Sequence, residues 1–473
     1  MEKFYIALQD FVALCIIINI SSGVKTSTRG AHAPTGCLPE SEVMSNSYFR
    51  TIKEVFSNRN ILGIAVTTSL ITLSDMGWRP FWSLYLTNEL GATIAAVGFL
   101  SMIQSSERLL FQLPGGILAD RFGRRKIIIY GTALRIITPI LYLWATHWTH
   151  VFWALIISGA TSVYMPAFNA IIADSLPETE RGAGYGAYRM ITSTPRIFSP
   201  IIGGVIMDSF GYLEGVRLFL YVSLGVNILV TYVRYRVITE TLVEESDAKR
   251  RTRVREKRTF KENMQETFDL PRTIWIMIAV AVLSSFGTRM VMSFTSIYAV
   301  EVIGLSNTQL GLVSTTAGLI TAALALPGGM MADRFGRKPM ILFSRVATPV
   351  SLFFTTLCGN FNQYYIVQGL NSLAAALGGG GGRGRAGGPA WNALVADIVP
   401  QQRRGTVQGA IGTVTGIVSA PASILGSYLW TNLGPQYPFY AASFTGIVGV
   451  AIFWIWVKEP KQVKRVDLPF DAG

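Results

Sequence analysis

Charged side chains interrupt several long apolar stretches of the sequence, and these side chains are the residues there most able to do chemistry. Carboxylates can bind and release a proton, and a desolvated carboxyl has a raised pKa. Arginines can hold an anion through two parallel hydrogen bonds. We expect roles in substrate binding or proton coupling for Asp75, Arg79, Glu107, Arg108, Arg189, Arg196 and Arg289.

The spacing of these charges predicts which of them act together. Asp75 and Arg79 are four residues apart and would share one helix face, so they form either a neutral structural pair or a proton or substrate site. Arg189 and Arg196 are seven residues apart and would also share a face. Glu107 and Arg108 have the uncharged Ile320 and Thr321 at the corresponding place in the second half. A fold does not need an asymmetric charge, which favours a functional role.

A second pair of arginines recurs at matching places in the two halves of the chain. Arg135 begins the run Arg-Ile-Ile-Thr-Pro, and Arg345 begins Arg-Val-Ala-Thr-Pro. Because both halves retain the arginine, we interpret this pair as structural.

Two longer segments are repeated as well. The segment 113–125 (LPGGILADRFGRR) recurs at 326–338 (LPGGMMADRFGRK), and 166–174 (PAFNAIIAD) recurs at 389–397 (PAWNALVAD). Glycine at the turn allows a tight backbone, a carboxylate can cap a helix N-terminus, and the arginines can pair with Asp174 or Glu178. The repeated positions predict a gating motif made of Gly116, Asp120, Arg121, Gly123, Arg124, Arg125, Asp174, Arg181, Gly329, Asp333, Arg334, Gly336, Arg337, Asp397 and Arg404.

The elements that carry these residues are membrane-spanning helices. Of the 473 residues, 50% are hydrophobic and only 15% are charged, where soluble proteins carry about a quarter. Apolar runs long enough to cross a bilayer recur, and they do not alternate as barrel strands do. The expected spans are 61–87, 93–117, 127–146, 150–172, 184–207, 216–236, 273–300, 307–331, 338–358, 362–396, 405–430 and 437–457.

The basic residues predict the orientation and the domains. Lys and Arg total 41 against 28 acidic residues, and they cluster in alternate loops, so those loops and both termini are expected to be cytoplasmic. We predict an N-terminal extension at 1–49, a six-helix bundle at 50–239, a basic linker at 240–270, a second bundle at 271–460 and a tail at 461–473.

The duplicated halves and the motif Gly116-x-x-x-Asp120-Arg121-x-Gly123-Arg124-Arg125, with its copy from Gly329, resemble the major facilitator superfamily. The resemblance covers residues 50–460. It implies an all-α polytopic membrane protein whose 12 transmembrane helices form two pseudo-symmetric six-helix bundles. It also implies that helices 1, 4, 7 and 10 line the cavity, and that the motif latches the bundles in the outward-facing state.

Within the family, two resemblances compete. Ser199-Pro200-x-x-Gly203-Gly204 is similar to an element of drug–proton antiporters, and its small residues would let helix backbones approach closely. The antiporters usually carry an arginine in helix 4, and residues 151–170 contain none. Arg79 and Arg289 instead look like the paired arginines of organic-phosphate exchangers.

Two segments do not fit the repeat. The Gly/Arg run 378–388 interrupts the tenth span and is interpreted as an insertion or a sequence-reading error, with a broken cavity-lining helix as the alternative. Residues 1–43 are interpreted as upstream translated sequence, with Met44 as the start, rather than as a signal-like segment or an extra helix.

The sequence therefore predicts a secondary active transporter of the cytoplasmic membrane, with proton-coupled efflux favoured. An exchanger or uptake carrier for an organic anion and a non-transporting membrane sensor are the alternatives. Without a phosphate-binding GxxxxGK[ST] motif or a nucleophile–base arrangement, we expect no enzyme activity and no cofactor. Three scattered cysteines and three scattered histidines predict no metal site. The expected partners are a small-molecule substrate, protons or a counter-substrate and the lipid bilayer, without nucleic acid and with the chain as a monomer.

Overall fold

Polar residues at the borders of apolar runs start several of the helices. Asn58 accepts hydrogen bonds from the backbone N–H groups of Asn60 (2.9 Å) and Ile61 (3.4 Å), which are donors that a helix N-terminus leaves unpaired. Ser306 and Gln309 form a reciprocal capping box at the start of another helix. The computed structural model describes residues 56–176, 181–240, 272–378, 389–399 and 404–457, and these residues form helices and no strand.

The first half of the chain, residues 56–240, contains the first six expected spans. Its elements are α3 (Arg59–Met76), η1 (Arg79–Phe81), α4 (Trp82–Asn88), α5 (Ile94–Phe122), α6 (Arg124–Leu134), α7 (Ile137–Trp144), α8 (Trp148–Thr161), η2 (Ser162–Tyr164), α9 (Met165–Ser175) and α10 (Arg181–Val237). Gly211, with φ +78°, turns the chain inside α10, which therefore covers two spans.

The second half, residues 272–457, repeats this order. Its elements are α13 (Arg272–Met292), α14 (Thr295–Ile297), η3 (Tyr298–Val302), α15 (Asn307–Phe335), α16 (Arg337–Thr355), α17 (Phe361–Leu377), α18 (Pro389–Ile398), α19 (Arg404–Ser419), α20 (Ala422–Asn432) and α21 (Tyr437–Trp456). The helices match the twelve expected spans to within a few residues. Residues 1–55, most of the basic linker, most of the Gly/Arg run and the C-terminal tail lie outside the described residues.

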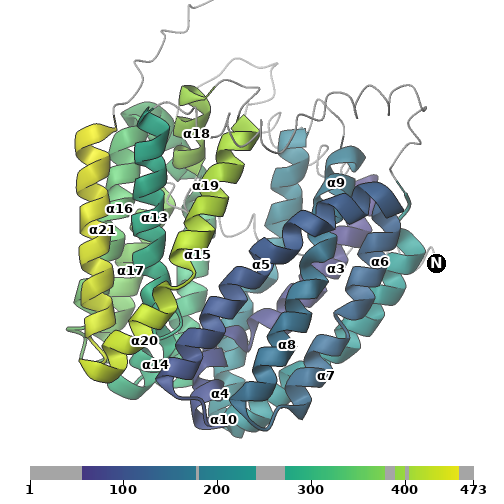
Figure 1. Ribbon diagram of the computed structural model, residues 1–473, viewed down its shortest axis with the longest axis horizontal. Coiled ribbons are helices and arrows are strands. Elements are labelled where there is room, and N and C mark those ends of the chain that lie inside the picture. The colour runs from purple at the N-terminus through teal and green to yellow at the C-terminus, as the bar shows by residue number, and fades with distance from the viewer. Residues whose placement is uncertain (1–55, 177–180, 241–271, 379–388, 400–403, 458–473) are drawn as a thin grey trace, which may run out of the picture.

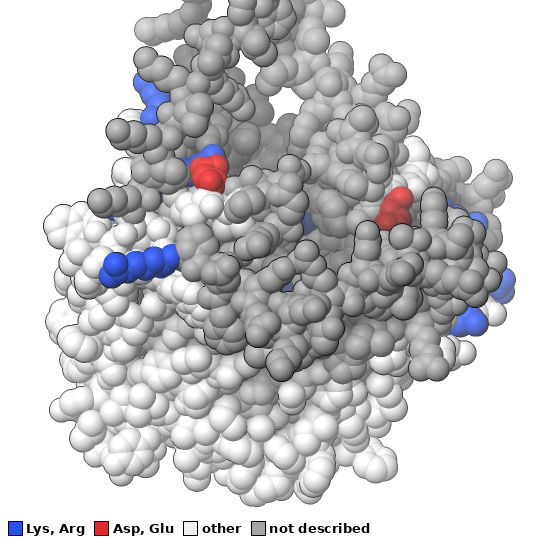
Figure 2. Space-filling model, turned by 45° about the horizontal axis from the view of Figure 1, so that its top comes forward, with Lys and Arg blue, Asp and Glu red and all other residues white. Residues whose placement is uncertain are grey.

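Length and composition alone support membrane crossing for part of this set. Seven helical segments of the described residues are long and apolar enough to cross a bilayer, and one of them, Gly184–Val237, is 54 residues long. In Figure 2 the visible flanks of both halves are uncharged, and charged side chains lie around the end that is turned forward.

The two halves stand side by side and meet at one end only of their described cores (Figure 1). One buried cluster contains residues of both halves, among them Trp78, Leu86, Phe294 and Leu310, and lies where α4, α14 and α20 come together. We call this the contact end. At the other end each half has a core of its own, around Ile64 and Phe168 in the first half and around Ile278 and Trp391 in the second. We call this the basic end, because α6 and α16 begin there with Arg124-Arg125-Lys126 and Arg337-Lys338.

Candidate functional site

The repeated motif forms the same turn in both halves. Gly123 separates α5 from α6 with φ +91°, and Gly336 separates α15 from α16 with φ +93°. A positive φ of this size suits glycine and disfavours residues with a side chain. A Cβ atom at Gly123 would also lie 2.9 Å from Oε2 of Glu240. The prediction that glycine allows a tight turn here is confirmed in both copies.

An ion pair follows each turn. Arg124, at the start of α6, pairs with Asp174 near the end of α9, and Arg337 pairs with Asp397 of α18. Nη1 of Arg337 also donates to the carbonyl of Ala393 (2.9 Å). The prediction that the arginines of the first motif pair with Asp174 or Glu178 is confirmed for Arg124 and Asp174. Each of these two pairs joins helices within one half.

The remaining motif positions are placed by their backbone. Gly116, Asp120 and Arg121 lie in α5, Gly329, Asp333 and Arg334 lie in α15, and Arg181 and Arg404 begin α10 and α19. The side chains of Asp120, Arg121, Arg181, Asp333 and Arg404 lie outside the described structure, as does Glu178. Arg334 is exposed, with its guanidinium carbon 5.8 Å from the ring centre of Phe335.

Glu240 completes the first turn and was missed by sequence reasoning. Its carboxylate accepts hydrogen bonds from the backbone N–H groups of Arg124 (3.3 Å) and Arg125 (3.0 Å), where the helix dipole favours a negative charge. Arg125 donates in return to the carbonyls of Ile238 (2.8 Å) and Tyr235 (2.9 Å). The first residue of the predicted linker therefore caps α6. Glu240 lies at the border of a charged segment and is 116 residues from Arg124 along the chain. Its position in the sequence therefore does not indicate this contact.

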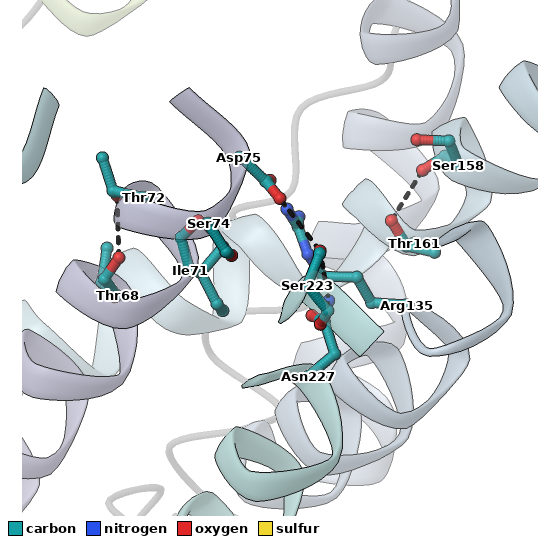
Figure 3. A network of polar contacts seen from close by, with 10 residues as sticks. All are labelled: Thr68, Ile71, Thr72, Ser74, Asp75, Arg135, Ser158, Thr161, Ser223 and Asn227. Atoms are coloured by element: carbon teal, nitrogen blue, oxygen red, sulfur yellow. Dashed lines mark hydrogen bonds and ion pairs between the residues drawn. The ribbon is translucent and has the colours of Figure 1, made fainter. Parts of the chain in front are cut away.

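Asp75 forms the central ion pair of the first half, and its partner differs from the predicted one. The Asp75 carboxylate pairs with Arg135, and its Oδ1 accepts a hydrogen bond from the Ser223 hydroxyl (3.2 Å). Asn227 in turn donates to the Ser223 hydroxyl oxygen (3.1 Å). Figure 3 shows these four side chains converging from α3, the α6–α7 junction and α10. Asp75 is 8% exposed, so this is a nearly buried charge.

The expected pairing of Asp75 with Arg79 is wrong for the described structure. Helix α3 ends at Met76, and Arg79 begins the short helix η1. Pro80 explains the interruption, since proline has no N–H to donate to the carbonyl of Met76 four residues earlier, and its ring crowds that carbonyl. Arg79 is exposed and makes no ion pair with a described carboxylate. Arg135, which was expected to be structural, therefore belongs to the candidate coupling site.

Glu107 lies against another helix of the same half. A Cβ atom at Gly159 of α8 would lie 2.7 Å from the Glu107 Cβ and 3.1 Å from its Oε2, so the absent side chain of Gly159 makes room for the carboxylate.

The other predicted coupling residues are dispersed. Arg189 and Arg196 of α10 are both exposed, and Arg289 lies in the last turn of α13, partly buried. The side chain of Arg108 lies outside the described structure. Among the described residues, no three His, Cys, Asp or Glu side chains gather as a metal site would require.

Two further arginines, the buried Arg234 and the partly buried Arg345, tie the helices of each half together. Arg234 of α10 is 1% exposed and donates to the hydroxyls of Thr67 (3.1 Å) and Thr132 (2.9 Å). Its guanidinium carbon lies 5.1 Å from the ring centre of Phe168. In the second half, Arg345 donates to Ser284 (2.6 Å) and lies 4.2 Å above Trp391. Hydroxyls and aromatic faces replace water around both cations.

Comparisons with known proteins agree with this architecture. The family model of the Major Facilitator Superfamily matches residues 64–309 and 277–471. Multidrug resistance protein 2 of Bacillus subtilis (strain 168) is 24% identical over 374 residues, covering 78% of this chain and 88% of that protein. The Na(+), Li(+), K(+)/H(+) antiporter of Planococcus maritimus is 20% identical over 404 residues, covering 80% and 91%.

A solved structure gives the fold. The inward open conformation of the xylose transporter XylE from E. coli superposes with a TM-score of 0.61 at 16% identity, covering 87% of this chain and 98% of that one. This likeness supports the predicted architecture of twelve helices in two bundles. The duplicated motifs, the two matching halves and the family match lead to one conclusion: the chain belongs to the Major Facilitator Superfamily and is a membrane transporter, not an enzyme.

Proposed function

We propose that this transporter exports a small molecule across the cytoplasmic membrane by alternating access, and that the proton gradient drives it through Asp75. The ion pair between Asp75 and Arg135 carries the proposal. Placing a single charged side chain at the centre of a membrane costs about 2.5–3.5 kcal/mol on insertion scales. The presence of two charged side chains there therefore favours a functional role for the pair.

The chemistry of the pair suits proton coupling. With Asp75 ionised, the two charges neutralise each other. Protonation of Asp75 leaves the Arg135 cation without its counter-charge, and the guanidinium must find another acceptor or move toward water. The Ser223 hydroxyl, which donates to the carboxylate, can rotate to accept the new proton's hydrogen bond. Proton binding is thereby linked to a movement of α6 and α7 relative to α3. The names of the Bacillus and Planococcus relatives, a multidrug resistance protein and a cation/proton antiporter, support this reading.

Orientation follows from the charges. Lys and Arg at the membrane surface favour the cytoplasmic side, so the basic end faces the cytoplasm and both termini are cytoplasmic. The halves meet at the opposite, extracellular end, so the structure corresponds to an inward-facing state.

We also propose that the chain works as a monomer, with bundles 50–239 and 271–460 moving as units about the 240–270 linker. The bonds of Arg234 and Arg345 within each bundle support that division.

In the outward-facing state the repeated motif would close the basic end. The Asp120→Asn variant should keep expression and topology but lose transport, because the charge that favours a helix N-terminus is removed while the shape is kept. Unchanged transport by this variant would remove Asp120 from the mechanism.

Proteoliposomes test the proton coupling. Tetraphenylphosphonium, a lipophilic cation, and Na⁺ serve as probes, and a trapped pH-sensitive dye reports proton movement. Wild type should move protons when a probe is added, and Asp75→Asn should not. Glu107→Gln tests the second carboxylate, and Glu214→Gln is the matched control, since Glu214 pairs with Arg217 within its own helix. Probe flux without proton movement, or normal coupling in Asp75→Asn, contradicts the proposal, and loss of coupling in Glu107→Gln alone would assign the proton to Glu107.

An organic-anion exchanger is the second candidate. Arg79 is exposed and forms no ion pair with a described carboxylate, and Arg289 lies partly buried in the last turn of α13. If Arg79 and Arg289 hold a phosphate or carboxylate, Arg79→Lys should fail nearly as badly as Arg79→Ala, because lysine lacks the planar fork. A fully active lysine variant contradicts this candidate, and any coupled flux excludes a non-transporting sensor.

A further inference from the structure

A carboxylate of the first half binds the start of a helix in the second half at the contact end. Asp208, in the part of α10 just before the Gly211 turn, accepts hydrogen bonds from the backbone N–H groups of Asn307 (3.0 Å) and Thr308 (2.7 Å). The side-chain amide of Asn307 also donates to Asp208 (2.9 Å). The Tyr212 hydroxyl donates to the amide oxygen of Asn307 (2.8 Å).

These bonds satisfy donors that α15 cannot satisfy by itself. The first N–H groups of a helix have no partner within the helix. Ser306, from the same half, accepts from Gln309 (3.1 Å). The backbone N–H groups of Asn307 and Thr308 donate to Asp208 instead. The Asp208 carboxylate also places a negative charge at the positive end of the helix dipole. Hydrogen bonds to an ionised acceptor are about twice as strong as neutral ones.

Close backbone packing lies directly beside this carboxylate. A Cβ atom at Gly204 of α10 would lie 2.8 Å from the Cα atom of Thr308, and one at Gly311 of α15 would lie 2.9 Å from the Cα atom of Ile201. Glycine at both places lets α10 and α15 touch, as the sequence predicted for the Gly203-Gly204 element. The contact therefore positions Asp208 within hydrogen-bonding distance of the helix start.

Among the described residues, hydrogen bonds between neutral groups also join the halves near this end. Ser293 donates to Ser101 (2.6 Å), and Ser423 donates to the carbonyl of Gly98 (2.9 Å). Such bonds exchange readily for bonds to water, with a small net effect. Asp208 is the charged contributor among these contacts.

We infer that Asp208 is the latch of the contact end: it holds the two halves together there, and its release from α15 is required for that end to open. The inference rests on the proposed alternating-access function. Each opening separates the carboxylate from the Asn307 and Thr308 N–H groups, which then bind water. The latch sets the ratio of closed to open molecules and thereby the bias of the transport cycle.

Distance measurements test the latch without needing a substrate. In the full chain with Cys15, Cys37 and Cys358 replaced, spin labels at Asn88→Cys (end of α4) and Thr431→Cys (end of α20) report the separation of the halves at this end. Both positions are exposed. Double electron–electron resonance in lipid nanodiscs should give a mainly short distance in wild type. Asp208→Ala should lower the ratio of short to long distances by about ten-fold or more, since three bonds to a charged group are lost.

Matched variants separate the latch from a general loss of structure. Glu214→Gln, at the same end and paired with Arg217 of its own helix, should leave the distribution unchanged. Asn307→Ala keeps the backbone donors and should shift the ratio in the same direction by less. If Asp208→Ala does not fold, Asn307→Ala and Tyr212→Phe carry the test. A mainly long distance in wild type, or an unchanged ratio in the folded Asp208 and Asn307 variants, overturns the latch. If Asp208→Ala shifts the ratio of short to long distances but the wild-type protein transports neither probe, the latch is supported. The proposed transport is then contradicted instead.

Discussion

Arg135 and Arg345 occupy matching positions in the two halves, but in the described structure they meet different partners. Arg135 pairs with the carboxylate of Asp75, whereas Arg345 bonds to the Ser284 hydroxyl and stacks on Trp391. The residue that corresponds to Asp75 in the second half is Ser285. Helix geometry differs too, since the chain breaks between α6 and α7 at Arg135, while α16 runs through Arg345 without a break. The duplicated arginine is therefore ionically paired in one half and held by neutral groups in the other.

This difference predicts an unequal response to mutation of the pair. Asp75→Ala should lower the free energy of unfolding by about 1–3 kcal/mol, because the partly buried Arg135 guanidinium, 23% exposed, is left without its counter-charge. The double variant Asp75→Ala/Arg135→Met should recover much of that loss, since no unpaired charge remains. Thermal unfolding of the four proteins of the cycle in detergent measures the coupling between the two residues. Additive effects of the two substitutions would contradict a direct pair.

The stacking of Arg345 on Trp391 predicts a second effect on stability. Trp391→Leu should destabilise the second half by about 2–4 kcal/mol, because it removes both buried aromatic area and the face that balances the cation. Trp454→Leu is the control, since Trp454 is 65% exposed. Equal melting temperatures for the two variants would show that Trp391 contributes nothing through Arg345.

Gly123 should tolerate no side chain. Gly123→Ala is expected to cost about 1–2 kcal/mol for the left-handed backbone, and its Cβ would also press on the Glu240 carboxylate. Gly329→Ala is the matched control in the same motif, because nothing lies within 4 Å of its Cβ position. Thermal stability should fall for the first variant and stay level or rise for the second. A reversed order would contradict the turn geometry.

The ion pair of Arg124 with Asp174 should matter little for stability. The two side chains are 19% and 37% exposed, and pairs of this kind contribute about 0–1 kcal/mol. Arg124→Gln should therefore melt within a few degrees of wild type while transport falls, if the motif acts in gating. The charge-exchanged protein Arg124→Asp/Asp174→Arg should regain part of the transport rate. Complete loss of folding in Arg124→Gln would assign the pair a structural role instead.

The contact at Asp208 predicts how closure at the contact end depends on pH. Burial raises the pKa of Asp208, but hydrogen bonds from Thr308 and Asn307 outweigh it and hold this pKa below its ordinary value of 3.8. At any pH above that ordinary value, the Asp208 carboxylate is ionised both when the latch is closed and when it is open. The stabilisation of the closed contact end is therefore fully present at those pH values. It is lost only as the pH falls through the lowered pKa. The nearby titratable groups are Tyr212 and, beyond it, Glu301, whose own pKa is raised by burial.

The distance distribution between labels at residues 88 and 431 should therefore stay constant from pH 6 to pH 8. Loss of closure within this range would show that another group controls the contact end.

The sequence by itself determined the helices, their number and their repetition. Apolar runs of membrane length, polar capping residues such as Asn58 and Ser306, and the glycines of the motif act locally, so their effect can be read without knowing the fold. The same holds for the turn at Gly123 and Gly336, where a positive φ is a property of the residue type. The sequence also predicted that the arginines of the first motif would pair with Asp174 or Glu178, and Arg124 does pair with Asp174.

Only the tertiary structure decided which charges meet across helices. Asp75 has an arginine four residues away, but it pairs with Arg135, 60 residues along the chain, because helix packing brings α3 against the α6–α7 junction and Pro80 interrupts the helix before Arg79. Glu240 and Asp208 cap helices 116 and 100 residues away. Such contacts depend on the rotation and approach of whole helices, which are set by many small packing terms spread over the bundle. Spacing along the sequence therefore does not predict these contacts between helices.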